Sequence, residues 1–334
     1  MAIGTGLGSQ LSFASESTYA TNVTPTKFLP VNKASIKEVK NFTQGGGLQG
    51  AALQIGSRRN VTTIGGTGSI ETQVFNRGLG LWLQTLMGTT VTPVQQTSTT
   101  AYKQTHTFAF DNSGKMLTVQ TAVPTTAGTL ASYTFAGCKV GSADMSFSVA
   151  DIATASFMID SAKIVTGVSV PAASYDNTMR PFVGTDAAIT VGTYGSTSPA
   201  TAATGVKKVS VKIERPMKMD RYYAGQSGVK AEPVPNDFAK ITGTIEADFV
   251  DKTLWADRFA TQSGFSLQIT LTGAAIGSSG YYDTFQVTLP CVYLDGDTPT
   301  VEGQDVISGS FPFTCLWDGT NYPSIVVISN ETTL

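Results

Sequence analysis

The chain repeats itself at a constant spacing, and this duplication limits the folds that it can adopt. Residues 67–72 read TGSIET and residues 242–247 read TGTIEA, an offset of 175 residues (242 − 67). The same offset aligns residues 35–37 (SIK) with residues 210–212 (SVK) and places Asn76 on Asp251. Because three separate segments share one offset, we infer two copies of one structural unit.

The offset between the two copies becomes smaller toward the end of each copy. Residues 151–157 (DIATASF) match residues 305–311 (DVISGSF) at an offset of 154 (305 − 151). The first copy therefore carries a longer loop, for which the polar, Thr-rich segment 89–107 is the candidate. We expect four parts: an N-terminal arm (1–24), a first domain (25–161), a linker (162–180), and a second domain with a C-terminal arm (181–334).

Hydrophobic periodicity predicts the same elements in both copies. Residues 69–74 and 244–249 alternate polar and apolar side chains, as half-buried strands do. A helix is expected after each strand, with Asn76 and Asp251 as N-caps and Gly88 as the stop in the first copy. The apolar face of that first helix comprises Leu79, Trp82, Leu83, Leu86 and Met87.

These elements predict a mainly β fold. We expect two tandem antiparallel β-sandwich or barrel domains, each with one flanking α-helix, related by internal duplication.

Charged residues are scarce, at 14% against roughly 25% in an average globular chain. The net charge of −2 argues against a basic nucleic-acid-binding protein. The sequence has no recognisable secretory signal and no run of 18 apolar residues, so we expect cytoplasmic synthesis and no membrane association. Its three cysteines, Cys138, Cys291 and Cys315, fit buried thiols better than disulfides. Weakly charged β structure needs its strand edges paired, which favours a protein that binds copies of itself.

Catalytic chemistry is not favoured by the residues present. A single histidine, His106, argues against histidine-based acid–base catalysis and His-rich metal sites. Glu71 and Glu246 hold equivalent positions, but the duplication assigns them to separate domains, unlike the paired carboxylates of glycosidases. Asp295 and Asp297 flank a glycine, which favours a turn over a cation site. We predict no enzymatic activity, no metal and no cofactor.

Short motifs run in order along nearly the whole chain. They comprise Glu16–Tyr19, Pro25, Phe28, Arg59, Gly68, Ile70, Glu71, Asn76–Gly80, Tyr133–Val140, Asp220–Tyr223, Gly243, Glu246 and Asp295–Pro299. This ordered set resembles the tail tube (major tail) proteins of long non-contractile-tailed bacteriophages. The Gly-rich loop 41–57 departs from the family pattern.

The resemblance implies a structural virion protein that forms stacked rings, and hence a hollow tail tube for genome delivery. Strands of neighbouring subunits would join into a continuous barrel around the channel. The implied partners are copies of the chain itself, a tape-measure protein and tail terminator or distal tail proteins, with assembly in the host cytoplasm. Since single-domain tubes of this kind form hexameric rings, two domains per chain predict a trimeric ring with pseudo-sixfold symmetry; a hexamer is the alternative.

The polar side of each alternating strand is the expected channel wall. It comprises Ser69, Glu71, Gln73, Thr244, Glu246 and Asp248. DNA should pass an uncharged or mildly acidic wall without specific binding, because few counterions would be released there.

Arms and long loops are expected to carry ring-to-ring contacts. These segments are 1–24, 41–60, 216–236 and 324–334. The alternative functions are a β-sandwich adhesin and a carbohydrate-binding surface protein. The second would need an exposed aromatic platform, whereas Trp82 and Trp255 fall in predicted helices and Trp317 near the end of the last strand.

Overall fold

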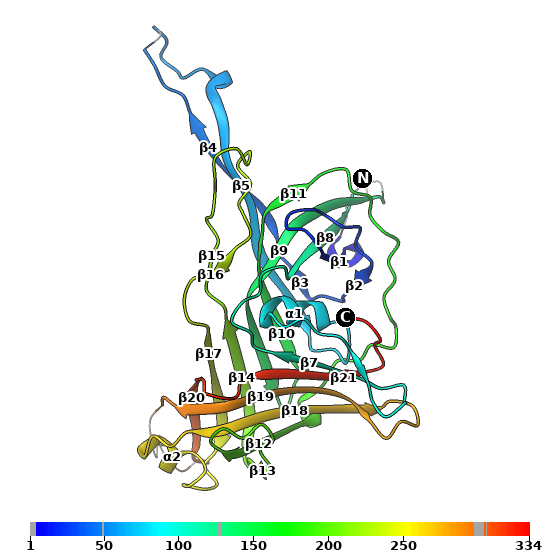
Figure 1. Cartoon of the computed structure of the whole chain (residues 1–334), viewed down its shortest axis with the longest axis vertical. Coiled ribbons are helices and arrows are strands. Elements are labelled where there is room, and N and C mark those ends of the chain that lie inside the picture. Colours follow the sequence, from blue (N-terminus) through cyan, green and yellow to red (C-terminus); the bar gives the residue numbers. More distant parts are fainter. Residues whose placement is uncertain (1–4, 49, 126–127, 297–303, 305) are drawn as a thin grey trace.

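The computed structural model describes residues 5–48, 50–125, 128–296, 304 and 306–334 (Figure 1). The motif residues Asp297–Pro299 and the start of the second repeat match, Asp305, lie outside the described residues. Within the described part of the chain, long antiparallel strands dominate and the two α-helices are short.

The first half of the chain supplies eleven strands and one helix. They are β1 (Gln10–Glu16), β2 (Lys27–Phe28), β3 (Lys33–Ala34), β4 (Lys37–Gln44), β5 (Arg59–Gln73), α1 (Gly80–Met87), β6 (Val94–Gln95), β7 (Tyr102–Thr107), β8 (Met116–Pro124), β9 (Leu130–Ser148), β10 (Thr154–Ser161) and β11 (Lys163–Val165).

The second half supplies ten strands and one helix. They are β12 (Ala187–Thr193), β13 (Thr201–Ala202), β14 (Val206–Glu214), β15 (Met217–Lys218), β16 (Val234–Pro235), β17 (Lys240–Asp248), α2 (Ala256–Ala260), β18 (Phe265–Ala275), β19 (Tyr282–Leu294), β20 (Ser308–Cys315) and β21 (Ser324–Ser329).

Among the described residues, three connected antiparallel sheets and a separate two-stranded sheet of β15 and β16 make up the fold, and pairing of β19 with β20 links two of the three. The first, which we call the shared sheet, has the order β4-β5-β10-β9-β14-β17-β20, with β3 also paired to β5. The N-half sheet has the order β2-β1-β8-β9-β11. The C-half sheet has the order β13-β12-β18-β19-β21-β7-β6. The predicted mainly β, antiparallel fold is therefore confirmed.

The sequence duplication reappears in the pairing of the strands. Lys33 pairs with Glu71 in the first half, and Lys208 pairs with Glu246 in the second, each position shifted by 175 residues. The two halves are also joined edge to edge, because β9 of the first half pairs with β14 of the second over seven residue pairs. The domain boundaries at residues 161 and 181 remain a prediction.

Each half packs its core around a tryptophan next to or within its short helix. Trp82 is fully buried, with its ring centroid 5.1 Å from that of Phe13 and 5.7 Å from that of Phe157. Trp255 is buried in the second half and stacks on Phe311 at 5.6 Å. Phe157 and Phe311 are related by the offset of 154, so both tryptophans pack on equivalent positions of the shared sheet.

The predicted helix in the first half forms, but its start is displaced. All five predicted apolar positions are buried, and Gly88 ends the helix with a φ of 89°. Both predicted N-caps are wrong, because α1 begins only at Gly80 and α2 only at Ala256. The Asn76 amide instead donates a 2.7 Å hydrogen bond to Asp283 in β19, while Asp251 accepts a bond from the backbone of Thr253 within a turn. A buried long-range partner thus outcompetes capping at Asn76.

Both chain-end segments predicted as arms are instead built into sheets. Gln10–Glu16 forms β1, which pairs with β8 along its whole length and has only one exposed residue. Its counterpart in the second half is β12, which pairs with β18 in the same way. Ser324–Ser329 forms β21, paired to β19 on one side and β7 on the other. Apolar side chains in these segments favour burial over a free arm.

The predicted insertion and linker also contain paired structure. Segment 89–107 holds β6 and β7, and β7 lies along β21, so part of the first half completes the C-half sheet. The linker 162–180 begins with β11, which pairs with β9. Neither segment has a hydrophobic periodicity long enough for the sequence to predict which strand it pairs with.

Candidate functional site

The six predicted wall residues lie on one face of the shared sheet. Ser69, Glu71 and Gln73 alternate with buried Ile70 and Thr72 along β5. On β17 the exposed and half-buried side is made by Thr244, Glu246 and Asp248. Because the two strands belong to the same sheet, alternation places both sets on a common surface, which we call the polar face.

The strand registers extend the polar face across both halves. One row of directly paired residues runs from Glu71 through Ser156, Asp144, Lys212 and Thr242 to Thr314. The next row runs through Gln73, Thr154, Ser146, Ser210 and Thr244. Antiparallel pairs share a face, so the polar face is continuous over six strands.

Lysines compensate the acidic residues of the polar face. Lys33 lies 2.9 Å from Glu71, and Lys208 lies 3.3 Å from Glu246, which is the same ion pair repeated at an offset of 175. Asp248 is paired with Lys207 at 2.6 Å. Alternation along β5 and β17 alone predicted a mildly acidic face. The lysines come from β3 and β14, whose position beside those strands only the tertiary structure defines.

Electrostatics in the middle of the face depend on Lys212. It lies 2.5 Å from Glu214 on the same strand, and this hydrogen bond raises the pKa of the Lys212 ammonium. Partial burial raises the pKa of Asp144, an effect that Lys212 opposes and Glu214 reinforces. The charges therefore lie close to neutralising partners instead of forming a field of one sign.

The arrangement suits a smooth polar surface better than a reaction centre. The face lines an open groove of about 820 Å³ with Ser, Thr and paired charged side chains. Glu71 and Glu246 are separated by four strand spacings, roughly 19 Å across the sheet, which is too far for carboxylates acting on one bond. Among the described residues no group of three or more metal-ligating side chains gathers. Likewise, no described helix has the length and apolar character needed to cross a membrane.

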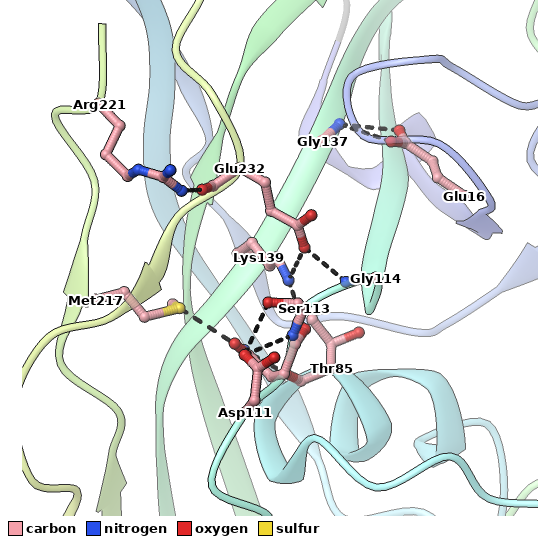
Figure 2. A network of polar contacts seen from close by, with 11 residues as sticks. Glu16, Thr85, Asp111, Ser113, Gly114, Gly137, Lys139, Met217, Arg221 and Glu232 are labelled. Carbon is pink, nitrogen blue, oxygen red and sulfur yellow. Dashed lines mark hydrogen bonds and ion pairs between the residues drawn. The ribbon is translucent and has the colours of Figure 1, made fainter.

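The segment between β14 and β17 joins the second half to the first. This segment, residues 215–239, lies across the first half, and Figure 2 shows its Glu232 between Lys139 and the backbone of Gly114. Glu232 Oε1 lies 2.6 Å from Lys139 Nζ and accepts a 2.7 Å bond from Gly114 N. Lys139 is fully buried, and desolvation lowers the pKa of its ammonium while Glu232 opposes that shift.

Further contacts fix the same segment to β5 and β10. Ile64 N donates a 2.9 Å hydrogen bond to Gly228 O, and Lys230 Nζ lies 2.6 Å from Asp160. Lys230 and Asp160 are both buried. Residues 216–236, predicted to contact another ring, are thus largely engaged within their own chain. No local sequence signal identified this buried ion pair.

A family model described as phage tail tube protein matches residues 6–315. No curated protein matches the chain.

Proposed function

The chain belongs to the phage tail tube protein family, and from that premise we propose that it polymerises into stacked rings whose channel delivers the phage genome. As a member of this family it is a structural component of the virion tail. Passage of DNA requires a continuous channel wall that does not bind phosphate groups. The polar face is the surface of the chain that fits this requirement.

The observation that carries the proposal is the polar face. It spans six strands from both halves, and its lysines are paired with carboxylates. Few unpaired cations would remain to exchange counterions with DNA, so DNA would meet the wall without strong binding. We place Ser69, Glu71, Gln73, Thr244, Glu246 and Asp248 in this channel wall.

The duplication supports a trimeric ring. In the shared sheet, β3 and β4 of the first half correspond to β14 of the second, β5 to β17 and β10 to β20, and the repeated Lys–Glu pair keeps the same register in both. Three chains would supply six equivalent units and give pseudo-sixfold symmetry; a ring of six chains is the alternative. A closed ring needs one heterologous contact, used once per chain.

The internal junction between the halves is a template for that contact. β14 pairs with β17 on one side and with β9 of the preceding unit on the other. β3 and β4 hold the position of β14 in the first half, and among the described residues they pair only with β5. The outer edge of β3 and β4 would therefore receive the end of a second copy's sheet, which removes an exposed strand edge.

Other partners follow from the family. A tape-measure protein would occupy the channel before ejection, and terminator and distal tail proteins would close the two tube ends. Assembly would take place in the host cytoplasm.

Electron cryo-microscopy of the purified, concentrated chain tests the proposal. The expected result is tubes of trimeric rings with Glu71 and Glu246 facing the channel. Tubes with both carboxylates on the outer surface would reject the wall assignment, and true sixfold symmetry would reject the trimer. Monodisperse monomers that bind glycans would favour the carbohydrate-binding alternative.

A further inference from the structure

An uncovered apolar groove lies at the end of the shared sheet in the second half. It has a volume of about 370 Å³, and residues on its lining include Phe238, Ala239, Leu316 and Trp317. Phe238 is 90% exposed, Leu316 52% and Trp317 56%. Exposed apolar side chains gathered in one place mark a surface that another molecule covers.

The duplication locates the equivalent place in the first half. Ala239 corresponds to Ile64 at the offset of 175, and Thr314, beside the groove, corresponds to Asp160 at the offset of 154. Ile64 and Asp160 are the residues on which the segment 215–239 lies, through Gly228 and Lys230. The first-half site is thus covered by the loop that follows β14 in the next unit.

The loop equivalent to that cover is the tip of the β4–β5 hairpin, of which the structure describes residues 45–48 and 50–58. At the offset of 175, Lys230 corresponds to Ile55. In Figure 1 the hairpin projects well beyond the rest of the chain. It exposes Leu48 almost completely and Ile55 to 42%.

We propose that the hairpin tip of one chain docks into the Phe238–Leu316–Trp317 groove of a second copy. The proposal rests on the self-assembly proposed above, and it repeats between chains the contact seen within one chain. The residues differ between the two sites. The first half pairs Asp160 with Lys230, whereas the equivalent positions carry the uncharged Thr314 and Ile55. The apolar groove begins at the next residue, Cys315.

This docking explains two exposed apolar surfaces together. Both surfaces expose apolar side chains to water in a single chain, and each would be removed from water by the other. The hairpin would then fasten the same chain-to-chain junction that the edge of β3 and β4 forms. Each pair of neighbouring chains would form this contact once.

Cysteine cross-linking tests the docking. Chains carrying Ile55→Cys and chains carrying Phe238→Cys, each with Cys315→Ala because Cys315 lines the groove, are mixed, assembled and oxidised. A disulfide-linked dimer is expected from the mixture and from neither chain alone. The matched control mixes Ile55→Cys with Val149→Cys, another exposed apolar position, and should give no dimer.

A second variant measures the contribution of the contact. Ile55→Asp would place a charge in the apolar groove, and we expect the critical concentration for assembly to rise at least about tenfold. Thr43→Asp, on the exposed part of the same hairpin, should change it less than about threefold.

Microscopy separates failure of the docking from failure of the function. Rings or tubes that form without the Ile55–Phe238 cross-link would overturn the docking and leave the tail tube function in place. If the cysteine chains do not assemble, a reconstruction of tubes of the unmodified chain tests the docking instead. Finding the hairpin tip away from Phe238 of every neighbouring chain would overturn it. An unmodified chain that stays monomeric at all concentrations would overturn both proposals.

Discussion

Protonation of His106 should destabilise the fold below neutral pH. His106 is fully buried on β7, directly opposite Ile325 of β21. Its Nε2 lies 3.4 Å from Gln104 Oε1. Burial lowers the pKa of His106 from 6.5 to about 4. Since it is the single histidine of the chain, its replacement removes all histidine titration.

The sign and size of the effect follow from linkage. The unfolded chain binds a proton on His106 more readily than the folded chain, so stability falls as the pH drops from about 6.5 toward 4. A shift of about 2.5 pKa units corresponds to about 3.4 kcal/mol in total. About 2 kcal/mol of this would be lost between pH 7 and pH 5.

Urea unfolding at pH 7, 6 and 5, compared between the wild-type chain and His106→Gln, measures this term. The glutamine does not titrate, so the difference in pH dependence isolates the histidine from the carboxylates. We expect the wild-type chain to lose about 2 kcal/mol more than the variant between pH 7 and 5. The stability of the variant at pH 7 does not enter the comparison.

Parallel pH profiles for the two chains would refute the reasoning. That outcome would mean that imidazolium is accommodated between β7 and β21, with a folded-state pKa near 6.5. A direct measurement of the imidazole titration by NMR would then have to give the same value.

Three further perturbations test other parts of the structure. Burial raises the pKa of Glu16 from 4.5 to about 6, so this group adds stability below pH 4.5 that is lost as the pH rises through 6. Glu16→Gln should therefore remove a change of about 2 kcal/mol in the unfolding free energy measured with urea across that pH range, and an unchanged pH profile would contradict this. Glu232→Ala should cost about 3 kcal/mol in unfolding free energy because it leaves the Lys139 ammonium buried without its carboxylate, and Lys139→Met should cost less; equal losses would contradict this account. Trp82→Ala should cost about 3–5 kcal/mol in thermal or urea unfolding, and a loss below 1 kcal/mol would show that the aromatic contacts to Phe13 and Phe157 contribute little.

Local patterns predicted the elements whose period is strong. Alternation along β5 and β17 assigned Glu71 and Glu246 to the polar side of a strand, because successive side chains on a strand point to opposite faces. The apolar spacing from Leu79 to Met87 predicted α1 for the corresponding helical reason. Both assignments needed only neighbours in sequence.

Capping and chain-end predictions failed where distant partners intervened. Asn76 has the right chemistry for an N-cap, yet a buried hydrogen bond to Asp283, 207 residues away, uses its side chain. β1 and β21 looked like arms because their partners, β8, β19 and β7, are remote in sequence. A local pattern carries no information on which strand will be adjacent.

Local sequence patterns were enough to predict a duplicated antiparallel β protein of low charge and to place the six predicted wall residues on the polar sides of their strands. That those two strands share one sheet follows from the folded structure alone, since β9 and β14 join the halves through backbone hydrogen bonds, which nearly all residue types can form. The pairing of β3 with β5 and of β14 with β17 brings Lys33 and Lys208 beside Glu71 and Glu246, so the face predicted to be acidic is charge-compensated. Alternation fixes the side of a strand on which a residue lies, and non-local pairing fixes which charges it meets there.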